Sequence, residues 1–293
     1  MACTAVCAVI TTFHPQMSSV ENIAKVRGQV EGLVVVDNGS SASSLASLRA
    51  AMREMDFTLI ENGANLGIAA ALNIGARWAE SRAFDCVVFF DQDSTAAPGF
   101  IGALRLTYDS HPRREEIAIV VPRYLDREGG EVFIPRYTGH DGGPLEVMTS
   151  GSFIPISIFK SCGGFREDFF IDQVDHEFGF RVREYGFIVV VSEKAVLLHG
   201  PGSPRDHSFM GLMRFRASHH NAMRRYYMTR NGIVMIRRYW NIYPAWSRSA
   251  AKSLLILPVL VLLAEAQKWK KLRNILLGTV DALRGRLGSV DLG

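Results

Sequence analysis

Short apolar runs alternate with longer amphipathic stretches through the first 121 residues, and this alternation constrains the fold more than any other feature. The apolar runs predict strands at 5–10, 33–36, 57–60, 86–90 and 117–121. The stretches between them predict helices at 20–30, 45–55, 67–81 and 100–108. Continuous apolar strands separated by helices are typical of a parallel sheet covered on both faces. The pattern therefore predicts an α/β fold with an open, mostly parallel sheet.

The last third of the chain differs in charge and in pattern. Between Arg205 and Arg273 there are 14 Lys or Arg against Asp206 and Glu265, a net charge of +12 in a chain whose total is +4. Such asymmetry indicates an anionic partner, namely a membrane surface, phosphate or nucleic acid. From about residue 215 the pattern is helical. We therefore expect a first domain at 1–210 and a basic, amphipathic helical region at 211–293.

The helical region is expected to break at Pro244, Pro258 and Gly278. Its longest uncharged apolar run, 253–264, is too short to span a bilayer, which needs roughly 20 residues. The N-terminus lacks a basic segment before its apolar run, so we interpret it as a strand and not as a signal peptide.

The cysteines show no CxxC spacing, and we expect all of them to be buried free thiols in a reducing compartment. They are Cys3, Cys7, Cys86 and Cys162.

Two aspartates follow the fourth predicted strand directly, in the sequence VVFFDQDS. Residues i and i+2 of an extended segment share a face, so the carboxylates of Asp91 and Asp93 repel each other unless a cation lies between them. Oxygen ligands of this type suit Mg²⁺ or Mn²⁺ together with substrate phosphates. The alternative is a simple turn before Pro98 and Gly99. In open α/β sheets, ligands bind at the carboxyl ends of the strands, where Asp37 also lies.

Two further turns have both a functional and a local interpretation. Asp37, in VVVDNGS, can accept a hydrogen bond from a nucleotide, or it can belong to a strand-to-helix turn capped by Ser40. The segment NGANLG at 62–67 brings a glycine backbone and free helical N–H groups to an anion, or it is a flexible turn.

Three later features are similarly open. Asp172 and Asp175 lie three residues apart at a helix start, where they either cap the helix or act as a general base. His199 is a candidate metal ligand or a structural histidine. The segment RRYYMTRN at 224–231 binds phosphate through its guanidinium groups, or it is a solvated basic face.

In order, the segments TTFHP, VVVDNGS, NGANLGIAAALNIG, VVFFDQDS, FFIDQVDHEFGF, LLHG and RRYYMTRN resemble the family 2 glycosyltransferases of GT-A fold. The chain looks most like the bacterial rhamnosyltransferases of O-antigen and cell-wall polysaccharide assembly. The resemblance covers about residues 5–235. It implies a Rossmann-like GT-A sheet with helices on both faces, followed by a C-terminal helical extension.

The resemblance also implies which residues form the site. The nucleotide sugar would be bound by Thr11, Phe13, Asp37, Asn65, Gly67 and Asp91, with Arg224, Arg225, Tyr227 and Arg230 on the diphosphate. The acceptor cleft would be bordered by Gly151, Ser152, Phe153 and Gln173. The divalent cation, Mg²⁺ or Mn²⁺, would be held by Asp91, Asp93 and His199.

The chain departs from the family pattern at the catalytic base. Many relatives carry Glu-Asp-x-Asp where this chain has Asp172-Gln173-Val174-Asp175. Gln173 cannot accept a proton, so Asp172 or Asp175 must take that role. We prefer Asp172 because it precedes the helix and can face the cleft, which leaves Asp175 to orient the acceptor or the base.

The resemblance implies an inverting transfer of L-rhamnose from dTDP-β-L-rhamnose to a lipid-linked or polysaccharide acceptor. The aromatic and basic residues around the apolar run at 253–264 suit a helix in the membrane interface, or a helical hairpin that forms a homodimer. A lipid-linked acceptor would place the protein at the cytoplasmic face of the bacterial inner membrane.

Within the glycosyltransferases, another nucleotide sugar is an alternative donor. Other classes of protein fit the sequence less well. A nucleotidyltransferase would usually carry a glycine-rich basic loop after the first strand, where this chain has TTFHPQMSS. The clustered apolar run in the basic region argues against nucleic acid as a partner. A non-catalytic carbohydrate-binding protein is the alternative that Gln173 raises.

Overall fold

The computed structural model describes residues 3–125, 130, 135–198 and 220–292, together with the backbone of two strands at 205–209 and 213–217. The chain divides into two compact units. The first, which we call the sheet unit, comprises Met1–Glu167 and Asp175–Gly200. The second, the helical unit, comprises Asp168–Val174 and Pro201–Gly293. The predicted boundary at residue 210 lies outside the described residues and stays a prediction.

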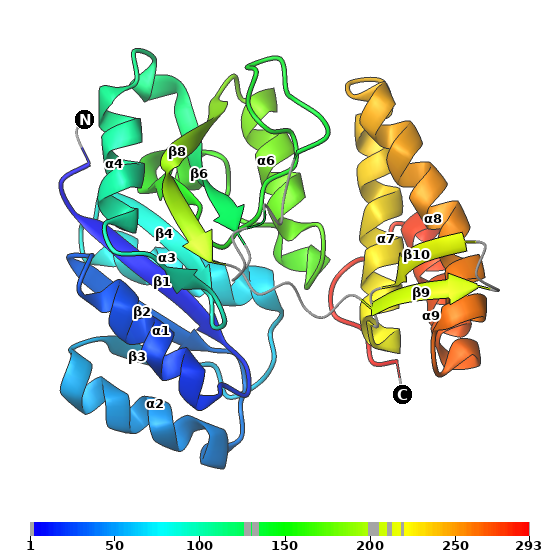
Figure 1. Ribbon diagram of the computed structural model, residues 1–293, viewed down its shortest axis with the longest axis horizontal. Coiled ribbons are helices and arrows are strands. Elements are labelled where there is room, and N and C mark those ends of the chain that lie inside the picture. Colours follow the sequence, from blue (N-terminus) through cyan, green and yellow to red (C-terminus); the bar gives the residue numbers. More distant parts are fainter. Residues whose placement is uncertain are drawn as a thin grey trace. The chain divides into compact units, whose positions relative to one another are not determined.

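The sheet unit is built on a mixed eight-stranded sheet in the order β3-β2-β1-β4-β7-β6-β8-β5 (Figure 1). The strands are β1 Val6–Thr12, β2 Gly32–Asp37, β3 Thr58–Glu61, β4 Cys86–Asp91, β5 Thr95–Ala96, β6 Ile117–Leu125, β7 Phe153–Pro155 and β8 Ile188–Leu198. β1 is parallel to β2 and β4, β2 to β3, and β6 to β8. β7 runs antiparallel between β4 and β6, and β5 is antiparallel to β8. The predicted fold class is confirmed.

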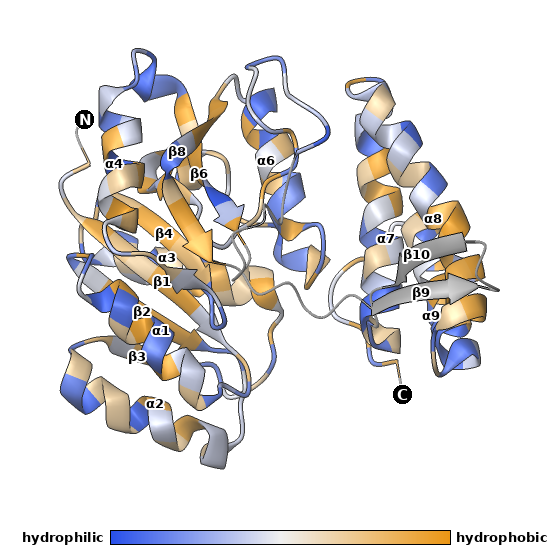
Figure 2. Ribbon diagram, in the orientation of Figure 1, coloured by the Kyte–Doolittle hydropathy of each residue, from blue (hydrophilic) through white to orange (hydrophobic). Residues whose placement is uncertain are grey.

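Helices cover both faces of this sheet. They are α1 Met17–Arg27, α2 Ala42–Met55, α3 Ile68–Ser81, α4 Phe100–Ser110, α5 Ile156–Ser161 and α6 Val174–Glu184. Alternation along β4 separates the faces, because successive strand residues point to opposite sides. Phe90 meets Phe100 of α4, with ring centroids 5.8 Å apart, whereas Phe89 meets Phe159 of α5 at 5.6 Å. The apolar character of the central strands β1, β2 and β4 is visible in Figure 2.

The helical unit contains three long helices, α7 Ala222–Tyr239, α8 Pro244–Ala264 and α9 Lys268–Arg284, and an antiparallel strand pair, β9 Arg205–Phe209 and β10 Met213–Ala217. Helix α7 packs against both α8 and α9. The predicted helix breaks at Pro258 and Gly278 are wrong, because both residues lie inside helices. Gly278 instead lets α9 approach α7: a Cβ there would lie 2.5 Å from the carbonyl oxygen of Tyr226.

Helix α8 is longer than the uncharged run in the sequence indicates. Its 21 residues are long and apolar enough to cross a membrane by length and composition, and only 17% of the most apolar window is buried. The sequence-based expectation underestimated the length of this apolar segment, because the helix begins at Pro244 and continues through Pro258.

The prediction of free cysteines is wrong for one pair. Cys3 and Cys86 form a disulfide, with Cα atoms 6.2 Å apart, while Cys7 and Cys162 are buried free thiols. The pairing of β1 with β4 brings residues together that are 83 positions apart in the sequence. Sequence spacing alone carries no trace of that proximity. Burial raises the pKa of Cys7 to about 12, which keeps this thiol protonated.

Candidate functional site

The carboxyl ends of β1, β2 and β4 bring several predicted site residues to one edge of the sheet. In the strand register, Thr12 of β1 lies beside Asp37 of β2, and Thr11 lies beside Asp91 of β4. Ligands of open α/β sheets bind at this edge. Phe13, the next residue after β1, is 45% exposed, so its ring is accessible to a ligand there.

Asp37 is buried and holds the turn that follows β2. One carboxylate oxygen accepts hydrogen bonds from the hydroxyls of Thr12 and Ser40, and the other from the backbone N–H groups of Gly39 (3.1 Å) and Ser40 (2.8 Å). Only 1% of the residue is exposed. Asp37 therefore stabilises the strand-to-helix turn, as the second of the two interpretations of VVVDNGS expects. For its carboxylate to accept a hydrogen bond from a nucleotide, this turn would have to open.

Asn65 and Gly67 are part of an asparagine network beside that turn. The amide of Asn38 donates to Asn65 Oδ1 (3.1 Å), and the same oxygen accepts from the backbone N–H of Gly67 (3.0 Å). Asn38 Oδ1 in turn accepts from Leu66 N–H (3.0 Å). The network presents the start of α3 at the same sheet edge, where its backbone N–H groups favour an anion.

The Asp91-Gln92-Asp93 turn is tied to both neighbouring segments. Gln92 exchanges two hydrogen bonds with the backbone of Phe13, at 2.9 and 3.2 Å. The backbone N–H of Asp91 donates to Ser150 Oγ at 3.2 Å. Asp91 is half-buried and Asp93 is exposed. The turn is therefore held by Gln92 and Ser150 while the carboxylate of Asp93 faces solvent.

These carboxylates fit a hard divalent cation. Within the described part of the chain, no group of three or more His, Cys, Asp or Glu gathers to form a complete metal site. Mg²⁺ is usually held by one or two carboxylates, with water and substrate phosphates filling the remaining positions. Asp91 and Asp93 supply that donor set. His199, the third predicted ligand, lies outside the described residues.

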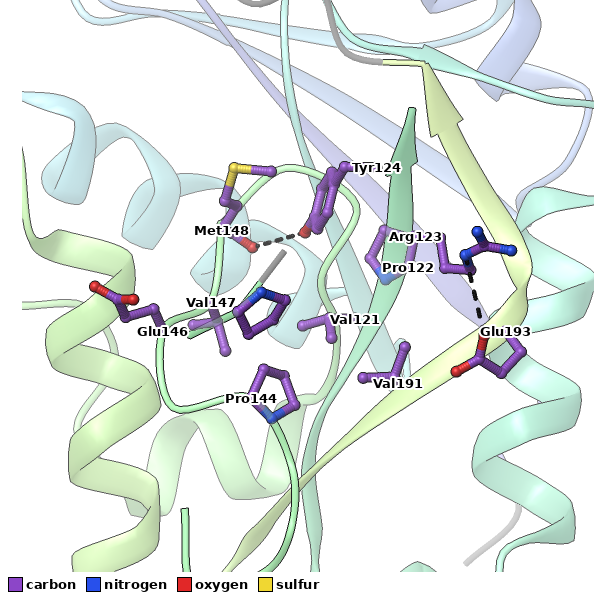
Figure 3. A pocket seen from close by; sticks show the side chains of 11 residues that line it. Val121, Pro122, Arg123, Tyr124, Pro144, Glu146, Val147, Met148, Val191 and Glu193 are labelled. Atoms are coloured by element: carbon purple, nitrogen blue, oxygen red, sulfur yellow. Dashed lines mark hydrogen bonds and ion pairs between the residues drawn. The ribbon is translucent and has the colours of Figure 1, made fainter. Parts of the chain in front are cut away.

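A cavity of about 210 Å³ lies between the second half of β6, the middle of β8 and the segment at 144–148 (Figure 3). Its walls are proline and valine side chains, and its polar groups are Arg123, Glu146 and Glu193. The hydroxyl of Tyr124, which also lines it, lies 3.0 Å from the carbonyl oxygen of Ser150. Ser150 therefore joins the cavity wall to the turn that carries Asp91.

Tyr124 also interacts electrostatically with Asp175, the predicted catalytic carboxylate of the sheet unit, and with Asp91, a predicted metal ligand. Burial, together with the negative charges of Asp175 and Asp91, raises the pKa of Tyr124 well above its usual value. The phenol is thus a neutral hydrogen-bonding group at ordinary pH. Asp175 stands in the first turn of α6 and accepts a hydrogen bond from His176 N–H at 2.9 Å.

Three of the predicted acceptor residues lie below the surface. Gly151 adopts a positive φ of 81° and donates to the carbonyl of Phe89 at 2.7 Å. Ser152 is 2% exposed, and Phe153 is fully buried against Tyr108, with ring centroids 5.5 Å apart. These residues support the wall behind the cavity and do not present side chains to it.

The helical unit contains Asp172 and all four predicted diphosphate ligands. The carboxylate oxygens of Asp172 accept hydrogen bonds from Arg224 Nε at 3.1 and 3.2 Å. The side chain of Arg224 is 43% exposed and that of Asp172 is 12% exposed. Gln173 follows in the same loop and is half-buried. The predicted base and one predicted phosphate ligand are therefore paired with each other.

The other three predicted diphosphate ligands are buried. Arg225 forms an ion pair with Glu265, Tyr227 stacks on Phe170 with ring centroids 5.0 Å apart, and Arg230 is 0% exposed. Of the four predicted diphosphate ligands, Arg224 is therefore the one whose side chain is exposed.

Sequence reasoning missed the residues that hold these loops, above all Gln92, Ser150 and Asn231. A usable signal existed for Gln92: in an extended segment its side chain points to the face opposite to that of its flanking aspartates, so it cannot share their ligand. Ser150 and Asn231 gave no such signal, because their partners are far away in the sequence.

Comparison with known sequences identifies the family of the chain. Residues 9–228 match Glycosyl transferase family 2. The chain is 27% identical to the dTDP-rhamnosyl transferase RfbF of Shigella flexneri over 297 aligned positions, which cover 96% of each protein.

Solved structures show the same fold. The fragment 1–349 of S. aureus TarS matches with a TM-score of 0.64 and 13% identity, covering 97% of this chain and 82% of that one. Its complex with UDP-GlcNAc matches with a TM-score of 0.63 and 14% identity, covering 95% and 81%. The mannosyltransferase PcManGT from Pyrobaculum calidifontis, in complex with GDP-Man and Mn²⁺, matches with a TM-score of 0.58 and 15% identity, covering 96% and 88%. At these identities the likeness establishes the fold alone.

Proposed function

The chain belongs to glycosyl transferase family 2, and we propose that it transfers L-rhamnose from dTDP-β-L-rhamnose to a hydroxyl group of a cell-surface glycan acceptor. The observation that carries the choice of donor is the end-to-end alignment with a dTDP-rhamnosyl transferase. The sheet edge supports the reaction type, because it gathers Phe13, the Asn38–Asn65 network and the Asp91–Asp93 turn where a nucleotide sugar would lie.

Asp91 and Asp93 would hold Mg²⁺ or Mn²⁺, with His199 as the third predicted protein ligand. When bound, the cation offsets the charge that develops on the diphosphate leaving group. Gln92 keeps the turn in place through its two hydrogen bonds to Phe13. Arg224, whose side chain is 43% exposed, would add a guanidinium to the diphosphate.

Asp172 would act as the general base. Its carboxylate takes the proton of the acceptor hydroxyl while that oxygen attacks the anomeric carbon, and the bond to the dTDP oxygen breaks. A single displacement inverts the configuration, so a β-L-rhamnosyl donor yields an α-L-rhamnoside. Asp175, in the first turn of α6, would orient the acceptor.

The acceptor would bind in the cavity beside Tyr124. Its proline and valine walls suit the apolar face of a sugar ring, and Arg123, Glu146 and Glu193 offer partners for hydroxyl groups. Tyr124 and Ser150 connect this cavity to the Asp91 turn. We propose a saccharide on a lipid carrier or a growing polysaccharide as the occupant; Gln173, the fourth acceptor residue expected from the sequence, lies in the helical unit.

A cytoplasmic protein bound to the inner membrane surface would meet a lipid-linked acceptor. Helix α9 places Trp269, Leu276 and Leu283 on one face, seven residues apart and 82%, 64% and 63% exposed. Leu255 of α8 is 79% exposed. The basic residues of these two helices are Arg248, Lys252, Lys268, Lys270, Lys271, Arg273 and Arg284. Near anionic lipid each exposed cation contributes about 1 kcal/mol.

Thermal shift with a panel of nucleotide sugars tests the donor. A ligand that binds the folded state raises its stability. We expect dTDP-L-rhamnose with Mn²⁺ to raise the unfolding temperature more than UDP-GlcNAc or GDP-mannose does. A larger rise in unfolding temperature with UDP-GlcNAc or GDP-mannose would show that this nucleotide sugar is the donor. No rise with any of them would contradict the proposed donor site.

Vesicle flotation tests the membrane surface. The full chain should float with anionic vesicles and not with zwitterionic ones, and Leu276→Glu should weaken flotation. Glu54→Gln, at an exposed position of α2, provides the control. A chain that stays in solution and runs as a dimer by light scattering would show that this face joins two copies instead.

A further inference from the structure

The loop that carries Asp172 has an unusual backbone. Phe170, Asp172 and Gln173 all have φ of 64°, in the left-handed region that residues other than glycine rarely adopt. Strained conformations of this kind persist only where the surroundings hold them. The groups that contact residues 168–173 therefore hold this backbone conformation.

Asn231 of α7 contacts the loop backbone three times. Its side-chain amide nitrogen lies 2.9 Å from the carbonyl oxygen of Phe169, 2.8 Å from that of Ile171 and 2.9 Å from that of Asp172. Asn231 is 0% exposed, so water does not compete for these bonds. One buried amide thus fixes the carbonyl directions on both sides of the strained residues.

Arg230, the neighbouring residue, holds the beginning of the same loop. Its Nη2 donates to the carbonyls of Asp168 (2.9 Å) and Phe169 (3.2 Å). Its guanidinium carbon lies 4.8 Å from the ring centroid of Tyr227, which stacks on Phe170. The fully buried guanidinium of Arg230 thus stabilises the loop backbone through its hydrogen bonds to these carbonyls.

The C-terminal tail completes the enclosure. Gly288 N–H donates to the carbonyl of Asp168 at 2.7 Å, and the carbonyl of Gly288 accepts from Arg230 Nη1 at 2.6 Å. Val290 N–H donates to the hydroxyl of Tyr227 at 3.1 Å. The tail, α7 and the loop therefore form one hydrogen-bonded assembly within the helical unit.

We propose that Asn231 and Arg230 are positioning residues for the transfer reaction: they lock the strained 168–173 loop and so fix the carboxylate of Asp172 for proton acceptance. This inference rests on the proposed function. It gives the buried arginine a role different from the diphosphate contact expected from the sequence. It also makes the C-terminal tail a support of the general base.

Asn231→Ala tests the proposal in the full chain, with Arg238→Gln at an exposed position of the same helix as the control. We expect the amides of residues 169–173 to exchange hydrogen at least tenfold faster in Asn231→Ala. The kcat should fall by about 10²-fold, because small misplacements of a catalytic group have effects of this size. The KM for the donor should change less than twofold.

A double variant separates positioning from general damage to the fold. In an Asp172→Asn background the base is already absent, so adding Asn231→Ala should cause no further loss of kcat. A further tenfold loss would overturn the proposal, and so would normal exchange in the single variant. Normal kcat with fast exchange would overturn it as well.

Arg230→Lys replaces the first variant if Asn231→Ala does not fold. Lysine keeps the charge but cannot donate to the carbonyls of Asp168, Phe169 and Gly288 in the fixed geometry of a guanidinium. If the wild-type chain transferred no sugar, the proposed function would fail, and the exchange measurement would still decide whether the loop is locked.

Discussion

Replacing Glu265 by Gln should destabilise the helical unit more than any exposed substitution. The side chain of Glu265 is 1% exposed and accepts hydrogen bonds from Arg225 and from Lys271 Nζ (2.6 Å). Those cations are 3% and 7% exposed. Glutamine keeps the shape of the side chain but leaves two buried positive charges without a negative partner. Removing one partner of a buried ion pair costs about 3–5 kcal/mol.

Urea unfolding followed by tryptophan fluorescence measures this loss. Three of the four tryptophans, Trp240, Trp246 and Trp269, belong to the helical unit and Trp78 to the sheet unit, so the assay uses a Trp78→Phe background in which the signal reports on the helical unit. Adding Lys271→Met to Glu265→Gln should recover at least about 1 kcal/mol, because it removes one of the unpaired charges. Glu54→Gln, the same chemical change at an exposed position, should alter the free energy of unfolding by less than about 0.5 kcal/mol.

A loss of less than about 1 kcal/mol in Glu265→Gln would contradict this prediction, since Arg225 and Lys271 would then be solvated in a way that their low exposure does not indicate. The prediction would also be refuted if Lys271→Met destabilised the Glu265→Gln chain further.

Three further predictions concern the turn at β4, a helix contact and pH. Asp93→Ala should abolish the Mn²⁺-dependent rise in unfolding temperature that dTDP produces, and should leave the ligand-free stability within about 0.5 kcal/mol, as scanning fluorimetry can check. Gly278→Ala should cost about 1–3 kcal/mol in urea unfolding because its Cβ meets the carbonyl of Tyr226, whereas Gly102→Ala, with open space around it in α4, should not destabilise. Burial, with the charges of Arg224 and Arg225, lowers the pKa of His220 to about 4. The folded state therefore binds this proton less readily than the unfolded chain, so stability is full above pH 6.5 and falls from there to about pH 4. His220→Gln should flatten that slope, and an unchanged slope would contradict the assignment.

The sheet and its ligand-binding edge were predictable because both rest on local patterns. Apolar runs in a regular alternation with amphipathic stretches specify parallel strands, and the end of a strand specifies where Asp37 and Asp91 must lie. The burial of Asp37 was not predictable to the same degree, since it depends on Thr12, whose alignment with it only the pairing of β1 with β2 reveals.

The role of α7 was harder to predict for a physical reason. Arginine and asparagine on an amphipathic helix are usually solvated, and nothing in RRYYMTRN distinguishes Arg224, which is exposed, from Arg230, which is buried. The carbonyl groups that Asn231 contacts lie up to 62 residues earlier in the chain, and backbone groups carry no sequence signature. The continuation of α8 through Pro258 was missed because proline usually ends or kinks a helix, whereas here the helix continues past it.

The assignment of Asp168–Val174 to the helical unit has a consequence for making chimaeras from this family. A swap that exchanges only the C-terminal region with that of a relative would leave the native loop facing a foreign helix at the positions of Arg230 and Asn231. A functional hybrid requires two further crossovers, one on each side of the segment Asp168–Val174, so that the loop is exchanged together with the helices that hold it. Recombination breakpoints in natural members should avoid separating these two pieces of chain.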